Sequence, residues 1–289
     1  VLAWGYNDEG ALGAGLDVSY SGPVEVPVRA DEGVSGIVAG DHSSLVLLGS
    51  GGLQCWGRNV SGELGYGESG FKRLPVPLKG LGPATRVIPG KWTSALAKGT
   101  DGPWRRVGGI TTANEQAAKL FEGFSPMDDV AMNIYAVEFA LARKPDGSLW
   151  TWGTRMRYDD NGQFGDGMIV TGNQFYDYQP QDARQVLLGG ATCTGSFCVS
   201  TGGRYYDGEV HCLAVTTTGT VKAWGSNENG QLGLGFLSNP GQATPATIPG
   251  LSNVTMVAGG GLHSLALRSD GKVLAWGNNS YGQVGDGTF

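Results

Sequence analysis

The dipeptide Trp-Gly recurs along this chain and divides it into units of about fifty residues. It begins at Trp4, Trp56, Trp152, Trp224 and Trp276. The spacings are 52, 96, 72 and 52 residues, and the interval of 96 fits two units because Val107-Gly108 stands at the missing place. A fixed period of this length is typical of proteins in which each repeat is one small supersecondary structure. We therefore expect the chain to fold as a series of similar sheets.

Each repeat has the pattern of two strands joined by a tight turn. In the clearest copy, apolar residues flank Asp270-Gly271, a dipeptide that suits the positive φ angles of a short hairpin. The loop after Trp-Gly has regularly spaced glycines, as in Asn227–Gly235, which let backbone segments approach closely. A proline-bearing segment such as Thr244–Pro249 follows. We expect it to be an outer edge strand, because proline cannot donate to a ladder on both sides.

The full pattern is Gly-x-x-His-Ser, Asp-Gly and Trp-Gly-x-Asn-x-x-Gly-Gln-Leu-Gly, and it resembles the regulator-of-chromosome-condensation repeat over nearly the whole chain. The resemblance implies an all-β protein, a β-propeller that is usually seven-bladed, with four-stranded blades. We expect five to six blades in one domain over residues 1–289, with insertions at 103–133 and 190–208. Val1–Gly15 is in phase with Val273–Gly287. Further repeats outside this sequence would complete a ring, or the repeats would continue as an open array.

Two segments depart from the repeat and are candidates for a binding role. Residues 103–133 carry a capping box ahead of good helix formers, which predicts a short helix at Thr112–Glu122. Residues 190–208 carry an arginine and two tyrosines, the residue types that most often anchor protein partners. The candidate partner-binding residues are Lys119, Phe121, Phe124, Arg204, Tyr205 and Tyr206. The alternative for both segments is that they only cover the propeller.

The four cysteines fall into two groups. Cys55 and Cys212 lie in expected strand cores, where a thiol behaves as a small, inert apolar group. Cys193 and Cys198 lie in a glycine-rich loop, at a spacing that allows a local disulfide. Such a disulfide would indicate an oxidising compartment, and the alternative is two free thiols.

The remaining polar groups are explained better by the repeat than by chemistry. We assign His42, His211 and His263 to the same slot, where a histidine would hydrogen-bond its own hairpin rather than hold a metal. The acidic run Asp159–Gly162 with Asp166 invites a calcium site, but it is also the glycine loop of its repeat. No nucleophile or carboxylate pair comes with a base at an interpretable spacing. We predict neither an enzyme nor a cofactor.

Charge and hydropathy reduce the number of function classes that fit this sequence. Twenty basic against twenty-six acidic side chains give a net charge of −6 without long runs, which argues against a nucleic-acid partner. No apolar run approaches the roughly eighteen residues that would span a bilayer. We predict a protein-binding scaffold that uses loops on one rim, secreted or displayed on the cell surface, with a cytoplasmic location as the alternative. The resemblance also implies nucleotide exchange on a small GTPase, and an open array would self-associate into an extracellular fibre.

Overall fold

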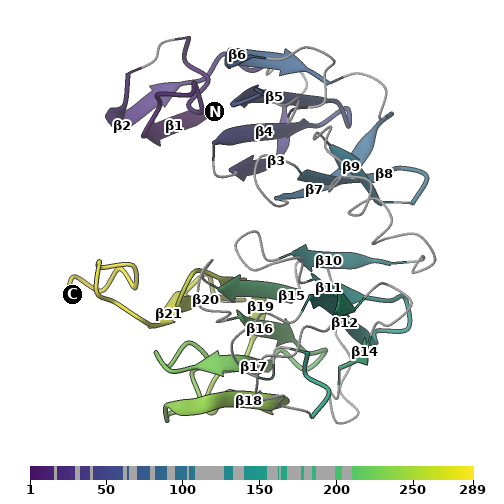
Figure 1. The fold of residues 1–289 in the computed structure, drawn as a ribbon, viewed down its shortest axis with the longest axis vertical. Coiled ribbons are helices and arrows are strands. Elements are labelled where there is room, and N and C mark those ends of the chain that lie inside the picture. Colours follow the sequence, from purple (N-terminus) through teal and green to yellow (C-terminus); the bar gives the residue numbers. More distant parts are fainter. Residues whose placement is uncertain are drawn as a thin grey trace. The chain divides into compact units, whose positions relative to one another are not determined.

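Every regular element that the structure describes is a β-strand, which confirms the predicted all-β class (Figure 1). The structure is a computed structural model. It describes residues 1–15, 18–29, 33–39, 42–60, 64, 70–78, 82–89, 95–102, 104–107, 127–132, 140–154, 162, 164–167, 177–178, 184–186, 199–203 and 210–289. The chain divides into two compact units, Val1–Ser125 and Pro126–Phe289. No helix among the described residues is long and apolar enough to cross a membrane.

Unit 1 contains three antiparallel sheets. The first pairs β1 (Leu2–Gly5) with β2 (Tyr20–Glu25). The second has the order β3 (Val34–Ala39), β4 (Ser43–Leu48), β5 (Leu53–Gly57) and β6 (Lys72–Pro77). The third has the order β7 (Ala84–Pro89), β8 (Ala95–Gly99) and β9 (Trp104–Val107). Strand β7 packs against β3 and β4, so the second and third sheets are neighbours.

Unit 2 also contains three sheets. The first consists of β10 (Asp129–Met132), β11 (Ala140–Arg143), β12 (Leu149–Thr154), β13 (Asp177–Tyr178) and β14 (Arg184–Gln185). The second has the order β15 (Val199–Gly203), β16 (Val210–Val215), β17 (Val221–Asn227) and β18 (Ser238–Thr247). The third has the order β19 (Val254–Gly259), β20 (His263–Arg268) and β21 (Val273–Gly277). Strand β15 packs against β10 and β11, and β19 packs against β15 and β16.

The predicted hairpins and edge strands are confirmed. Gly271 adopts a φ of 82° in the turn between β20 and β21, and its N–H donates to the Arg268 carbonyl at 3.0 Å. Strands β6 and β18, which carry the prolines, are the outermost strands of their sheets. The same register recurs in three sheets, since the residue opposite the repeat tryptophan is Ser44, Cys212 or Ser264.

The core of each unit is formed by these strands and by the loops that follow Trp-Gly. In unit 2, Trp224, Phe164 and Leu232 are fully buried in one cluster. As predicted, Cys55 and Cys212 are buried in strands, and burial raises the pKa of Cys55 to about 12 and that of Cys212 above its ordinary value. Neither thiol is therefore a thiolate at neutral pH, which agrees with an inert role.

The two predicted insertions contain regular strands of the sheets. The segment 103–133 begins in β9, which pairs with β8, and ends in β10, which pairs with β11. Residues 199–203 of the segment 190–208 form β15, the first strand of its sheet. Ser200–Gly203 resembles loop sequence, yet it pairs with β16 through backbone groups. The predicted helix at Thr112–Glu122 lies outside the described residues.

Candidate functional site on the Trp-Gly loops

The loop that follows each Trp-Gly, here called the Trp-Gly loop, is closed by an asparagine side chain. The asparagine Oδ1 atom accepts the N–H of the residue five positions later, in the pairs Asn7 with Leu12 (2.9 Å), Asn59 with Leu64 (2.8 Å), Asn227 with Leu232 (3.2 Å) and Asn279 with Val284 (2.9 Å). In three loops the Nδ2 atom also donates to a later carbonyl, of Val18 at 3.1 Å, of Phe236 at 2.8 Å and of Thr288 at 3.0 Å. These loops are held by their own hydrogen bonds, so they present their exposed side chains from a fixed backbone.

On two of these loops rests the tryptophan of the next sheet. The Trp56 Nε1–H donates to the Ala11 carbonyl at 2.8 Å, and the Trp276 Nε1–H donates to the Gln231 carbonyl at 2.9 Å. Two residues beyond these carbonyls, Gly13 and Gly233 lie so close that an added Cβ would stand 2.6 Å and 2.9 Å from the Nε1 atoms. These two glycines are therefore explained by packing against an indole side chain, whereas the repeat pattern predicted a close approach of backbone to backbone.

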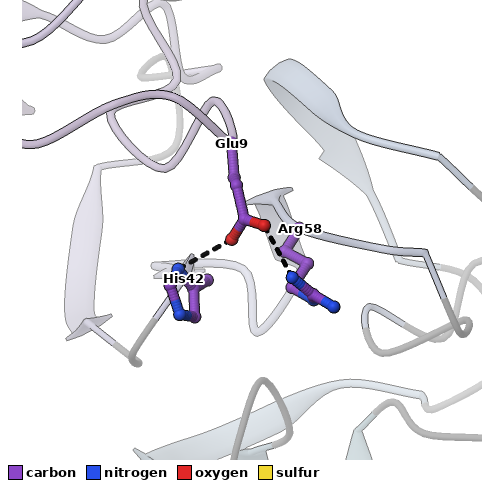
Figure 2. A network of polar contacts seen from close by, with 3 residues as sticks. All are labelled: Glu9, His42 and Arg58. Carbon is purple, nitrogen blue, oxygen red and sulfur yellow. Dashed lines mark hydrogen bonds and ion pairs between the residues drawn. The ribbon is translucent and has the colours of Figure 1, made fainter.

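A cluster of ionisable side chains lies at this contact in unit 1, and Figure 2 shows its three members. We call it the Glu9 cluster, and it consists of Glu9, His42 and Arg58. The Arg58 Nη1 donates to Glu9 Oε1 at 2.6 Å, and His42 Nδ1 lies 2.7 Å from Glu9 Oε2. The Glu9 side chain is 19% exposed, whereas those of Arg58 and His42 are 37% and 41% exposed. The carboxylate is thus the inner member, and the two basic side chains border the solvent.

The equivalent contact in unit 2 has no charge. There Asn278 Nδ2 donates to Asn229 Oδ1 at 3.1 Å, across the same sequence separation of 49 residues that joins Arg58 to Glu9. The charges of the Glu9 cluster are therefore a departure from the repeat at a position where neutral amides also suffice. Tyr6, in the same Trp-Gly loop as Glu9, is 73% exposed. Sequence reasoning missed this site because it searched for insertions rather than for substitutions within the repeat.

The prediction for the three histidines is partly wrong. His211 and His263 stand opposite Gly225 and Gly277, as equivalent positions should. In unit 1, however, it is Ser43 that stands opposite Gly57, so His42 lies one residue earlier in the repeat. The ladder of backbone hydrogen bonds sets this register, and a shared His-Ser dipeptide does not.

The expected hydrogen bond within the histidine's own hairpin is also wrong for His211. Its Nε2 atom lies 3.0 Å from the Ser264 Oγ of the next sheet, because the ring is buried between the two sheets. Among the described residues, no group of three or more His, Cys, Asp or Glu side chains could hold a metal ion. Of the acidic run, Asp159, Asp160 and Asn161 lie outside the described residues. The described Gly165 packs on Trp224 as a repeat glycine does.

The other predicted site residues cannot be placed. The partner-binding candidates Lys119, Phe121, Phe124, Arg204, Tyr205 and Tyr206 lie outside the described residues, as do the two cysteines of the proposed disulfide, Cys193 and Cys198. These assignments stay predictions.

Comparison with protein families identifies the repeat. The model described as "Regulator of chromosome condensation (RCC1) repeat" matches residues 1–47 and 218–267, and a second model of that description matches residues 254–283. Among curated proteins, the chain is 27% identical over 99% of its length to the ultraviolet-B receptor UVR8 of Arabidopsis thaliana, covering 51% of that protein. It is equally similar to the mitochondrial RCC1 domain-containing protein RUG3 of the same plant, with the same coverage. The chain thus spans about half the length of these relatives.

Solved structures agree with the family match. The chain is similar to yeast RCC1 (Prp20), solved with Kap60 bound, with a TM-score of 0.73, 20% identity, and coverage of 100% of this chain and 68% of the other. Human WBSCR16 gives a TM-score of 0.69 at 18% identity, with coverage of 96% and 73%. At this identity the likeness concerns the fold, and it confirms the predicted β-propeller class.

Proposed function

Because the chain is built from regulator-of-chromosome-condensation repeats and has the fold of that family, we propose that it is a non-enzymatic scaffold that binds a protein partner through its Trp-Gly loops. The observation that carries the proposal is the Glu9 cluster. A repeat needs only a polar pair at this contact, as Asn229 and Asn278 provide in unit 2. Unit 1 instead places Arg58 and His42 at the solvent boundary, and it exposes Tyr6 in the same Trp-Gly loop as Glu9. Arginine and tyrosine are residue types that dominate protein interfaces.

The rigidity of the loops supports binding rather than mere covering. Asn7 is buried and closes its Trp-Gly loop through Leu12, and Trp56 is fixed against the same loop. A partner that docks on a fixed backbone loses less conformational entropy than one that must order a loop. The side chains of the Glu9 cluster are thus presented in a ready geometry.

A non-catalytic role is supported by a serine and a histidine that lie together in the described part of unit 2. Both Ser264 and His211 are fully buried. The Ser264 hydroxyl donates its single proton to the Gln231 carbonyl at 2.8 Å, so His211 does not act on it as a base. The pair has the residue types of a catalytic dyad without the access or proton arrangement.

Two substitutions, each of which removes one positively charged side chain, test the binding of a protein partner. The chain would be immobilised, captured proteins identified by mass spectrometry, and the affinity of the main partner measured by calorimetry. We expect Arg58→Ala to weaken the affinity at least tenfold, and Lys272→Ala, which removes an exposed cation from the hairpin turn of β20 and β21, to leave it unchanged. Equal affinities for both variants would contradict the placement of the site on unit 1.

The location outside the cell stays part of the proposal. It rests on the composition and on the proposed disulfide between Cys193 and Cys198. Mass spectrometry of the native protein with and without reduction tests it, because the protein gains two hydrogen atoms, about two mass units, when one disulfide is reduced. Two free thiols at these positions would remove the main support for secretion. Self-association into a fibre also stays a proposal, which a compact monomer in solution would contradict.

Nucleotide exchange on a small GTPase is the second candidate, and the likeness to yeast RCC1 favours it. A study of the same yeast protein reports its binding properties to Gsp1p and histones. If our chain acts in this way, it accelerates nucleotide release from at least one member of a panel of small GTPases. Binding without acceleration would leave the scaffold as the function.

A further inference from the structure

His211 occupies a buried position between two sheets of unit 2. It lies on β16, and its side chain has no solvent exposure. Its ring reaches Ser264 on β20, with 3.0 Å between Nε2 and Oγ. Strand β19, which belongs to the same sheet as β20, packs against β15 and β16, and the Gly259 N–H donates to Ser200 Oγ on β15 at 2.9 Å. The histidine is therefore part of the contact that holds the β19–β21 sheet to the β15–β18 sheet.

The hydrogen bonds of Ser264 determine where the imidazole proton lies. A serine hydroxyl has one hydrogen, and Ser264 gives it to the Gln231 carbonyl at 2.8 Å. The contact with His211 is a hydrogen bond only if His211 Nε2–H donates to the serine oxygen. The neutral ring then leaves Nδ1 without a hydrogen, and within the described part of the chain Nδ1 makes no hydrogen bond of good geometry. This tautomer satisfies every group at the contact except Nδ1, which a neutral imidazole tolerates as a bare acceptor.

We propose that His211 makes the contact between these two sheets acid-sensitive, so that the contact is closed at neutral pH and opens when the ring takes up a second proton. The added proton would have to sit on Nδ1, inside the packed interface. A charged imidazolium there has lost its water and gains no carboxylate from the residues that the structure describes. Opening the interface returns the charge to solvent, so protonation and opening are coupled.

The charged groups that the structure describes around His211 do not offset this cost. On the elements packed against it, β15, β18 and β19 contain no titratable side chain. Strand β17 contributes Lys222, the Trp-Gly loop contributes the exposed Glu228, and β20 contributes His263 and Arg268. Of these groups, His263 is the one that affects the pKa of His211, because a positive charge on His263 would repel one on His211.

The pKa of His211 agrees with this geometry. Burial, and to a lesser degree the charge of His263, lower it from 6.5 to about 4, although the backbone of His263 acts in the opposite direction. The opened state, with an ordinary pKa, takes up the proton first as the pH falls. The closed contact is therefore fully favoured above pH 6.5 and loses stability between pH 6.5 and about 4.

Hydrogen exchange on the whole chain tests the coupling. The opening equilibrium of the β20 and β21 amides, corrected for intrinsic exchange rates, should rise roughly 20-fold between pH 7 and pH 5. In His211→Gln the amide can still donate to Ser264 but cannot titrate, so the rise should fall below about threefold. The matched control is His263→Gln, at the same slot of the next repeat, which should keep most of the rise, because burial is the larger cause of the lowered pKa of His211.

A titration of the native protein keeps the test independent of variant folding. The histidine Cε1–H resonances are followed by NMR while the pH is lowered, and His211 is expected to show no titration above pH 5. A His211 resonance that titrates near pH 6.5 would overturn the proposal. So would a pH-dependent opening that persists in full in His211→Gln.

Discussion

Two contacts in which a tryptophan rests on a Trp-Gly loop, that of Trp56 in unit 1 and that of Trp276 in unit 2, are built alike inside and differ at their solvent edge. In both, the indole and a serine donate to one carbonyl, which is that of Ala11 in unit 1 and that of Gln231 in unit 2. The distances of these four hydrogen bonds lie between 2.8 and 2.9 Å. At the edge, Arg58 with Glu9 in unit 1 corresponds to Asn278 with Asn229 in unit 2. The interior of the contact is thus specified by the repeat, and the edge is free to vary.

The physical reason lies in what each position must satisfy. A buried backbone carbonyl needs donors at fixed places, and a loop under an indole has no room for a Cβ. An edge position needs only some polar partner, since water can satisfy what the partner does not. Function can therefore change at the edge without cost to the fold, and this is where we placed the binding site.

The largest expected effect comes from the interior. Gly13→Ala and Gly233→Ala each place a Cβ within 3 Å of a tryptophan Nε1 and force a non-glycine residue to φ angles of 71° and 67°. We expect each to lower the free energy of unfolding by about 3 kcal/mol, from strain and overpacking together. Urea unfolding followed by tryptophan fluorescence measures both.

Gly235→Ala is the control for the backbone part of that effect. Gly235 has a φ of 83°, but nothing lies within 4 Å of an added Cβ. Its cost should therefore be about 1 kcal/mol, from the positive φ alone. A Gly13 or Gly233 variant no less stable than this control would show that the indole contact does not need glycine.

The next largest effect concerns the buried asparagines. Asn7→Ala and Asn227→Ala each leave a buried leucine N–H, of Leu12 or Leu232, without its acceptor. A buried donor without a partner costs about 1–3 kcal/mol, so we expect about 2 kcal/mol in each variant by the same unfolding measurement. If the loops are equivalent, the two values agree within about 1 kcal/mol. A larger difference would mean that the repeat does not specify the two interiors equally.

The contrast between interior and edge also explains what the sequence could predict. Asp270-Gly271 and the prolines of β18 act locally, so the hairpin and the outer strand follow from a few neighbouring residues. The Glu9 cluster joins residues 9, 42 and 58, which no local pattern brings together. The sequence could have revealed the Glu9 cluster only through a comparison of Arg58 with Asn278, which stands at the same position of its repeat. The shift of His42 by one residue was hidden because only the pairing of Ser43 with Gly57 reveals it.

The smallest effect on stability is expected at the edge. The double variant Glu9→Asn with Arg58→Asn gives unit 1 the amide pair of unit 2. A partly exposed ion pair contributes little, so the coupling between Glu9 and Arg58 in a double-mutant cycle should be below about 1 kcal/mol and should shrink at high salt.

That small stability effect is what makes the edge variant informative about function. With the fold intact, a tenfold or greater loss of affinity for the protein partner can be assigned to the lost charges rather than to unfolding. The reverse result, a coupling of several kcal/mol together with unchanged binding, would make the Glu9 cluster a structural contact between the first two sheets. This result would contradict the distinction between interior and edge, because the edge of unit 1 would then stabilise the fold as Trp56 does.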